Sequence, residues 1–416
     1  MTAQNEVRRV VAAIDQDVRA RVLGSLARRF GDLDLAEDML QEALAQALRT
    51  WPERGVPAVP EAWLHTTAKR KALDVVRREA VLARKLAELR IQEERHETAP
   101  AGAVPDDRLG LFFACCHPVL APEDRVALTL RFLAGLSTAE VAHALLVPVP
   151  TMQQRIVRAK KRIRTLGVTF ESPRPEELPA RLRGVQRVIY LLYAEGFARS
   201  AGSEHIRDDL TTEAIRLARV LRELMPSTTE VIGLLALLVL TEARRPARTG
   251  PDGQPVPLSD QQRTLWRADL VREGVQLAEV AAAGPEPGAY SIQAAIAAVH
   301  AEAASFEETD WAQIVVLYRL LSAHEPNPVV QLGAAVALGR AHGPAVGLER
   351  LDELAVEPTL DRYRPFHVAR ATTLAELGEV ERASRAYQRA LELPGNDAED
   401  RFLLAALAGL DESMGP

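Results

Sequence analysis

The stretch TMQQRIVRAKKRIR, residues 151–164, carries six positively charged side chains and no negative one, in a chain whose formal net charge is −6. Apolar residues recur in it at helical spacing, and arginines recur at the same spacing on a neighbouring face. The stretch therefore predicts a basic amphipathic helix that begins with a capping box from Thr151 to Gln154. The predicted apolar stripe consists of Met152, Ile156, Ala159 and Ile163.

The preceding residues, LSTAEVAHALLVPVP (136–150), predict a second and shorter helix. Ser137 and Glu140 form another capping box, and the helical pattern stops at Val147-Pro148, shortly before the basic helix begins. Two short helices with so tight a connection are typical of a helix-turn-helix, whose second helix enters the major groove of DNA. For the basic helix considered alone, a solvated surface helix is the alternative interpretation.

The helix-turn-helix hypothesis divides the basic helix into two kinds of DNA contact. Residues near the N-terminus of a recognition helix meet base edges, whereas the cations that follow sit on phosphates. The predicted base-reading set is Thr151, Gln153, Gln154 and Arg155, and the predicted phosphate-binding set is Arg158, Lys160, Lys161 and Arg162.

Charge is divided unevenly along the chain. Residues 1–165 hold 26 Lys+Arg and 21 Asp+Glu, a net of +5, whereas the remaining residues hold 25 and 36, a net of −11. Such asymmetry indicates a half that faces nucleic acid joined to a half that does not. A length of 416 residues allows two or three domains, and a hydrophobic content of 47% with 5% aromatic residues suits a helical, Ala/Leu-rich protein.

Other classes of protein find little support in the sequence. It contains no signal peptide and no apolar run long enough to span a membrane, so we expect a cytoplasmic protein without membrane contact. Because we find no Gly-rich phosphate loop, nucleophile elbow or HExxH motif, we expect neither an enzyme nor catalytic residues. Cys115 and Cys116 precede His117, but no second pair lies at zinc-site spacing. We therefore expect buried thiols, no metal and no cofactor, and leave a redox role open.

Two further helices are predicted nearer the N-terminus, on either side of a proline-rich break. DLDLAEDMLQEALAQALRTW (32–51) predicts an amphipathic helix capped by Asp34, WPERGVPAVP (51–60) predicts a loop, and EAWLHTTAKRKALDVVRREA (61–80) predicts an aromatic and basic helix. Cations beside flat side chains fit a melted DNA strand, because cations track phosphates and flat groups contact unstacked bases. A core Trp with solvated cations is the alternative. The apolar stripe of the first helix is Leu40, Ala43, Leu44 and Ala47.

Taken in this order, these segments resemble a known family. The acidic helix, the loop and the basic helix resemble the promoter-melting domain of bacterial extracytoplasmic-function (ECF) sigma factors, and residues 125–164 resemble their second, helix-turn-helix domain. The resemblance covers about residues 10–165. It implies an all-helical factor that binds RNA polymerase core, directs it to −10 and −35 promoter elements and assists strand opening.

The resemblance also implies roles for particular residues. The acidic helix matches the surface that docks on the large polymerase subunits, β and β′. The loop 51–60 matches the loop that captures a flipped −10 base, and a preformed pocket of this kind couples recognition to melting. Because Lys69-Arg70-Lys71 stands where many relatives have an Asn, the −10 sequence preference is not carried over. The implied core-binding residues are Glu37, Asp38, Gln41 and Glu42; the implied −10 contacts are Trp51, Trp63, Lys69, Lys71, Asp74, Arg77 and Arg78; the two sets in the basic helix become the −35 contacts.

The C-terminal half is predicted to be helical, with breaks rich in Pro and Gly. LAELGEVERASRAYQRALELP (374–394) resembles a tetratricopeptide (TPR) repeat, and Gly343 precedes Gly378 by 35 residues, close to the period of that repeat. Stacked helix pairs of this type present a concave surface that binds peptides or proteins. The whole arrangement resembles ECF sigma factors with a long C-terminal TPR-like extension. The repeat positions are Gly378, Ala383, Ala386, Tyr387, Ala390, Leu391 and Pro394.

The predicted fold is therefore all-α, with two small helical sigma domains followed by a TPR-like helical-hairpin array. Predicted boundaries are 8–80 for the promoter-melting domain, 81–108 for a linker, 109–168 for the helix-turn-helix domain and 180–416 for a C-terminal domain that regulates in cis. Expected partners are RNA polymerase core, promoter DNA and a protein or peptide ligand of the array. The alternative function is a TPR-fused helix-turn-helix activator, which would not need the acidic docking helix or the Trp-containing basic helix.

Overall fold

The computed structural model of the chain describes residues 7, 9–11, 14, 16–86, 106–145, 147–197, 208–251 and 253–412. Over these residues the fold is all-α, as predicted, and an isolated bridge between Thr249 and Pro255 is the β-type pairing found in them. The predicted linker 81–108 lies largely outside the described residues. The chain divides into two compact units, Met1–Val188 and Ile189–Pro416.

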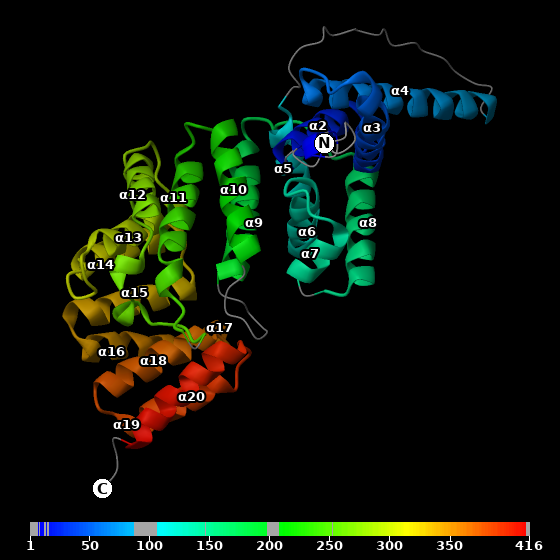
Figure 1. The fold of residues 1–416 in the computed structure, drawn as a ribbon. Coiled ribbons are helices and arrows are strands. Elements are labelled where there is room, and N and C mark those ends of the chain that lie inside the picture. Colours follow the sequence, from blue (N-terminus) through cyan, green and yellow to red (C-terminus); the bar gives the residue numbers. More distant parts are fainter. Residues whose placement is uncertain are drawn as a thin grey trace. The chain divides into compact units, whose positions relative to one another are not determined.

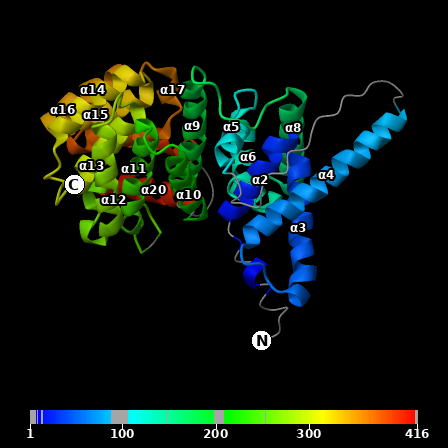
Figure 2. The ribbon, with the colours of Figure 1, turned by 90° about the horizontal axis from the view of Figure 1, so that it is seen from above.

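In the first unit, the described helices form two groups, and the helices of each group pack against one another. Helices α2, α3 and α4 pack against one another, and α4 is the long helix that crosses α3 in Figure 2. Helices α6, α7 and α8 form the second group, and α5 contacts both α2 and α6. The bounds are α2 Gln16–Phe30, α3 Leu33–Arg54, α4 Pro60–Leu86, α5 Arg108–Cys115, α6 Pro122–Phe132, α7 Thr138–Ala144 and α8 Val149–Thr165.

The N-cap of the acidic helix α3 is Asp32, and the predicted cap at Asp34 is wrong. The Asp32 carboxylate accepts hydrogen bonds from the backbone N–H of Asp34 at 2.8 Å and of Leu35 at 3.2 Å. Asp32 and Asp34 both belong to a residue type that is preferred at the N-cap, so the sequence does not distinguish them. The backbone conformation does, because Asp32 is extended and precedes the first helical residue. The predicted apolar stripe is confirmed, since Leu40, Ala43, Leu44 and Ala47 are all buried.

The loop that follows α3 is shorter than predicted. The helix continues through Trp51 and Pro52 to Arg54, so the predicted loop 51–60 is reduced to 55–59. Trp51 is buried, and its carbonyl accepts a hydrogen bond from Gly55 N–H at 2.9 Å. Gly55 has a φ of +81°, which ends the helix at a conformation that favours glycine. The free energy gained by burying the Trp51 indole thus outweighs the cost of the backbone hydrogen bond that Pro52 cannot donate within the helix.

In the second unit, helices that follow one another along the chain pack side by side (Figure 1). Contacts join α11 to α12 and α13, α15 to α16, and α18 to α19. The bounds are α10 Asp208–Leu224, α11 Thr229–Ala243, η1 Arg245–Ala247, η2 Leu258–Asp260, η3 Arg263–Leu265, α12 Ala268–Ala282, α13 Ala289–Glu302, α14 Trp311–His324, α15 Pro328–His342, α16 Pro344–Leu354, α17 Pro358–Asp361, α18 Arg364–Glu376, α19 Val380–Leu391 and α20 Asp397–Glu412.

The two glycines of the predicted repeat mark the turns of two helical hairpins. Gly343 separates α15 from α16 with a φ of +105°, and Gly378 separates α18 from α19 with a φ of +74°. Side chains other than glycine rarely adopt such angles, which explains why glycine recurs at this spacing. Behind the second turn, the buried core contains Leu348, Leu374, Ala383, Ala386, Tyr387 and Ala390.

The division between the units falls inside α9 (Leu178–Phe197). Phe170 is only 2% exposed, and the Arg181 guanidinium donates to the Phe113 carbonyl at 2.7 Å. The residues that follow α8 therefore pack with the first unit up to Val188. The domain boundaries given by the sequence stay predictions.

Candidate nucleic-acid interface

The short helix α7 begins with the predicted capping box. Ser137 N–H donates to the Glu140 carboxylate at 2.7 Å, and Glu140 N–H donates to Ser137 Oγ at 3.2 Å. The hydrogen bond from the Ser137 backbone, together with that to its side chain, holds the pKa of Glu140 below its ordinary value. This prediction is confirmed, and the box fixes where the chain enters the helix-turn-helix.

The basic helix α8 begins earlier than predicted. It starts at Val149 with Pro148 as its N-cap, and Pro150 lies in its first turn, so the predicted capping box from Thr151 to Gln154 is wrong. Proline is tolerated in the first turn because the N–H groups there have no acceptor within the helix. The predicted stripe is confirmed, because Met152, Ile156, Ala159 and Ile163 are the buried residues of α8.

The polar face of α8 leaves most of the predicted DNA contacts accessible. Arg155 is half-buried, with its Nε 4.0 Å from an Asp124 carboxylate oxygen. Because the apolar stripe is buried against α6 and α7, hydrogen-bonding groups and cations are left on the opposite side. The exposed members of the two predicted sets are Thr151, Gln153, Gln154, Arg158, Lys161 and Arg162.

Lys160 is the exception among the predicted phosphate contacts. Its side chain is only 13% exposed, and its Nζ forms an ion pair with Asp34 and lies 3.8 Å from a Glu37 carboxylate oxygen. The same ammonium lies 5.9 Å from the centroid of the Phe132 ring. In this conformation Lys160, which the sequence assigns to a DNA phosphate, is paired with carboxylates of α3 instead.

The acidic face of α3 likewise contains both exposed residues and one that is paired within the unit. Asp38, Gln41 and Glu42 are exposed, whereas the Glu37 side chain is 19% exposed and accepts a hydrogen bond from the Arg131 guanidinium. Arg164 adds a contact of 3.3 Å to Asp32 and one of 3.9 Å to Asp34. We call these six residues the α3–α8 charge cluster: Asp32, Asp34, Glu37, Arg131, Lys160 and Arg164.

Sequence reasoning missed this cluster. The bonded pairs Arg131–Glu37 and Arg164–Asp32 are separated by 94 and 132 residues. The available signal was a basic helix and an acidic helix of opposite charge, which does not specify a contact between them.

Two tryptophans lie where the loop 55–59 joins α3 and α4. Trp51 is 2% exposed, Trp63 is half-buried, and their ring centroids are 5.2 Å apart in an edge-to-face arrangement of 68°. In this conformation the ring of Trp51 is enclosed in the core against Trp63 and offers no surface to DNA, contrary to its predicted role as a −10 contact. In the loop, Val59 is 60% exposed.

The basic face of α4 continues beyond Trp63. Lys71 is half-buried, with its Nζ 3.3 Å from a Glu42 carboxylate oxygen, which joins the predicted −10 surface to the predicted polymerase surface. Lys69 is half-buried, and the remaining predicted residues Asp74, Arg77 and Arg78 are exposed. The contacts of these residues with DNA stay predictions.

The adjacent cysteines are buried thiols, as expected. Burial raises the pKa of Cys116 to about 11 and that of Cys115 well above its ordinary value. Redox-active cysteines need thiolate character and solvent access, so this geometry disfavours the redox role that the sequence left open. Among the described residues, no group of three or more His, Cys, Asp or Glu could hold a metal ion.

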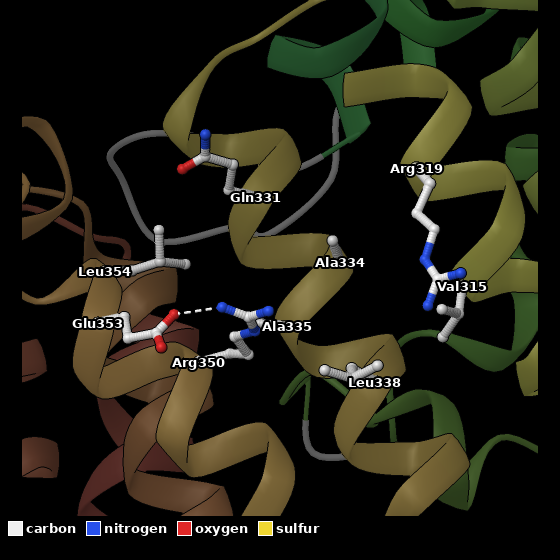
Figure 3. Close-up of a pocket in the computed structure, with 9 residues that line it drawn as sticks. All are labelled: Val315, Arg319, Gln331, Ala334, Ala335, Leu338, Arg350, Glu353 and Leu354. Atoms are coloured by element: carbon white, nitrogen blue, oxygen red, sulfur yellow. Dashed lines mark hydrogen bonds and ion pairs between the residues drawn. The ribbon is translucent and has the colours of Figure 1, made fainter. Parts of the chain in front are cut away.

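A pocket of about 300 Å³ lies between helices α14, α15 and α16 (Figure 3). Arg319 and Arg350 approach it from different helices, and the Arg350 guanidinium donates to Glu353 at 2.5 Å. Apolar walls with cations at the rim suit a peptide segment that carries a carboxylate. The lining is Val315, Arg319, Gln331, Ala334, Ala335, Leu338, Arg350, Glu353 and Leu354.

Comparisons with known proteins identify the regions that carry these surfaces. Residues 15–81 match Sigma-70 region 2, residues 113–163 match Sigma-70, region 4, and residues 181–282 match a family of unknown function, DUF6596. An uncharacterized protein of Rhizobium meliloti is 39% identical over 391 residues, which cover 92% of each chain. The ECF RNA polymerase sigma factor SigE of Mycolicibacterium smegmatis is 30% identical over 145 residues, 35% of this chain and 56% of that protein. No solved structure matches significantly.

No helix in the part of the chain that the structure describes combines the length and the apolar character needed to cross a bilayer.

We predict that Ser137→Ala loosens α7, because it removes the side chain that caps the helix. The expected loss is about 1 kcal/mol, which corresponds to roughly fivefold faster amide hydrogen exchange in α7. Thr151→Ala is the matched control, since Thr151 caps nothing and should change exchange in α8 little. Equal effects of the two substitutions on their own helices would contradict the assigned cap.

Proposed function

Because the chain belongs to the ECF-type sigma factors with a C-terminal extension, we propose that it binds RNA polymerase core, directs it to −10 and −35 promoter elements and assists strand opening. The observation that carries this proposal is that Thr151, Gln153 and Gln154, at the N-terminal end of α8, are exposed within the match to Sigma-70 region 4. Sigma factors are transcription factors and not enzymes, which agrees with the sequence-based expectation.

The proposed polymerase contact is the exposed acidic face of α3. Asp38, Gln41 and Glu42 lie at helical spacing within the match to Sigma-70 region 2 and are exposed. Glu37 would complete this face once its pair with Arg131 opens. The large β and β′ subunits are the proposed partners, by resemblance to the family.

The proposed DNA contacts divide between the two regions. At the −35 element, Gln154 can pair in bidentate fashion with adenine and Arg155 with guanine, while Arg158, Lys161 and Arg162 hold phosphates. At the −10 element, Trp63 offers a flat surface to an unstacked base, backed by the buried ring of Trp51. The cations of α4 would then hold the phosphates of the melted strand.

We also propose that the α3–α8 charge cluster gives the free protein a closed conformation. In it, Glu37 is withheld from polymerase and Lys160 is withheld from DNA, because each pairs within the first unit. Asp38, Gln41 and Glu42 stay exposed and provide a first contact for polymerase. The Arg164–Asp34 pair is largely exposed and contributes little by itself, and the more enclosed pairs of Glu37 and Lys160 can open when a partner competes for their charges.

The extension is proposed to regulate these regions in cis and to read a signal at its own surface. The residues after 165 carry a net charge of −11, which disfavours contact with phosphates. The pocket of Figure 3 is the proposed docking place for a peptide ligand, with Arg319 available for its carboxylate, whereas Arg350 is paired with Glu353. In this proposal a ligand bound by the extension shifts the sigma regions from the closed conformation to a polymerase-competent arrangement.

The first prediction from the proposed function concerns transcription with purified core polymerase and this chain as the sole specificity factor. We expect initiation at a defined promoter without any other sigma factor. Gln154→Ala should change base preference at one −35 position by about 1–3 kcal/mol, whereas Lys161→Ala should weaken binding on all sequences and flatten its salt dependence. A requirement for a second sigma factor would favour the TPR-fused activator, and identical sequence-independent losses would contradict the division of roles.

The second prediction contrasts two acids on α3. Asp34→Asn should raise the affinity for core by about three- to tenfold, because it weakens the closed state without touching the exposed docking face. Asp38→Asn should lower that affinity. Fluorescence transfer between dyes on Glu53→Cys and Ala139→Cys reports closure without polymerase, and the native thiols are buried and do not react. Unchanged transfer in Asp34→Asn, or a fall in core affinity, would contradict the closed state.

The third prediction concerns the pocket of the extension. Arg319→Glu should change transcription from a dependent promoter in cells but leave transcription by the purified components unchanged, because the peptide ligand is absent there. Arg385→Glu is the control, since this exposed arginine on α19 does not line the pocket. If both substitutions behave like the unaltered chain in cells, the pocket has no regulatory role.

A further inference from the structure

We propose that the extension binds a small oxyanion, carrying a phosphate or carboxylate group, at a cluster of nitrogen donors around Trp266. The inference goes beyond the proposed function, since it concerns neither the sigma regions nor the pocket of Figure 3. The cluster, here called the Trp266 site, consists of Arg244, Arg263, Trp266 and His300. Arg248 adjoins it, with its guanidinium over the Phe197 ring and a hydrogen bond of 2.8 Å to the Phe197 carbonyl.

The site is assembled by the segment that connects α11 to α12. Helix α11 ends at Ala243 with Arg244 as its C-cap, and η1 follows directly. Arg263 is the first residue of η3, whose C-cap is Trp266. A hydrogen bond of 2.9 Å from Arg267 N–H to the Ala243 carbonyl closes this connection on itself. Within it, Val256 N–H donates to the Arg248 carbonyl at 2.7 Å. The arginines are therefore held by backbone hydrogen bonds and are not on a free loop.

Two guanidinium groups lie against one indole ring. The guanidinium carbon of Arg263 is 4.6 Å from the centroid of the Trp266 ring, and that of Arg244 is 5.6 Å from it. Trp266 is 7% exposed. Attraction to the ring stabilises each cation separately, but it does not remove the repulsion between them.

Hydrogen-bonding atoms around this ring are left without partners. Arg244 Nε, Trp266 Nε1 and His300 Nδ1 are buried and have no hydrogen-bond partner. His300 belongs to the same place, because its carbonyl accepts a hydrogen bond from the Arg263 guanidinium. Buried polar atoms in native proteins are almost always paired, so unpaired atoms on residues linked by these contacts indicate a missing group. A ligand that supplies only acceptors would satisfy all of them.

The carboxylates nearby are already engaged or serve other arginines. Glu242 lies 2.8 Å from Arg245 Nε and accepts from the Tyr193 hydroxyl at 3.3 Å. Glu307 acts electrostatically on Arg263, and Glu399 and Glu242 act on Arg248. No carboxylate among the described residues forms an ion pair with Arg244, which makes its charge the least compensated of the three.

The electrostatic environment of Arg244 and His300 agrees with this assignment. Burial lowers the pKa of Arg244 to about 10, and the charge of Arg263 acts in the same direction. Burial, together with the Arg244 and Arg263 charges, lowers the pKa of His300 to about 4. His300 is therefore neutral near pH 7 and can donate from Nδ1 in one tautomer. Both guanidinium groups stay charged, and a bound anion would raise all of these pKa values.

The donor set defines the class of ligand. A guanidinium forms paired hydrogen bonds with the two oxygens of a carboxylate or a phosphate, and its planar fork prefers such groups over chloride. The indole N–H and the imidazole N–H then supply donors from other directions. Arg244, Arg248, Arg263 and Trp266 all lie within residues 181–282, the match to the family of unknown function.

The test uses the full-length protein without polymerase, so its failure and that of the proposed function are distinguishable. Melting of the protein is followed in sodium phosphate, in sodium acetate and in sodium chloride at matched ionic strength. We expect a saturable rise in the melting temperature with phosphate, acetate or both, beyond that in chloride, because a ligand that binds the folded state stabilises it. The anion that acts identifies the group that the site prefers.

Variants at the Trp266 site separate binding from a structural role. Arg244→Gln should bind the active anion roughly tenfold more weakly, and without anion it should melt no lower than the unaltered chain, because an uncompensated buried cation has been removed. Arg222→Gln, an exposed arginine on α10, is the control and should keep the full response. In nitrogen-resolved NMR, the indole N–H signal of Trp266, identified with Trp266→Phe, should move on adding the anion.

Three outcomes of the anion experiments would overturn the proposal. These are no response to phosphate or acetate beyond that to chloride, the same response in Arg244→Gln as in the unaltered chain, and a Trp266 indole signal that stays in place at saturating anion. A large loss of stability in Arg244→Gln without anion would identify a structural arginine and also reject the site.

Discussion

None of the described helices buries its apolar face by itself, and this constraint shapes both units. In α8, Met152, Ile156, Ala159 and Ile163 must turn inward against α6 and α7, which leaves glutamines and cations on the outer face. In α3, burial of Leu40, Ala43, Leu44 and Ala47 leaves Asp38, Gln41 and Glu42 outside. The functional surfaces are thus the residual faces of helices whose orientation is set by the hydrophobic effect.

The exposed faces of α3 and α8 carry opposite charges, so each can pair either with the other or with a separate partner. Within the free chain, Glu37 and Lys160 pair across the α3–α8 charge cluster, whereas polymerase and DNA would pair with each separately. Side chains selected to bind partners of opposite charge are also suited to bind one another. Salt should therefore weaken both the closed state and the open complexes, in proportions set by how many charges each one buries.

The second unit uses charge differently. It is acidic as a whole, yet it holds the half-buried side chains of Arg244, Arg248 and Arg263 close to aromatic rings. Arg248 and Arg263 donate to the carbonyls of Phe197 and His300, whereas Arg244 Nε has no acceptor, so it is the Arg244 charge that calls for a physical explanation. Together with the pocket between α14, α15 and α16, the Trp266 site would give the extension two separate places at which a signal could bind.

The sequence by itself determined the features whose cause lies within a few residues. These include the apolar stripes of α3 and α8, the Ser137–Glu140 capping box and the glycines at the turns after α15 and α18. Helical period, caps and left-handed turns are local properties of the backbone. Only the tertiary structure decided that Asp32 rather than Asp34 caps α3, that Trp51 is enclosed beneath Trp63, and that Lys160 is paired with α3. It likewise brought His300 to the arginines that follow α11. Each of these features depends on residues far apart in the chain becoming neighbours in space. The packing of the whole unit decides which residues do so, and no local sequence pattern specifies it.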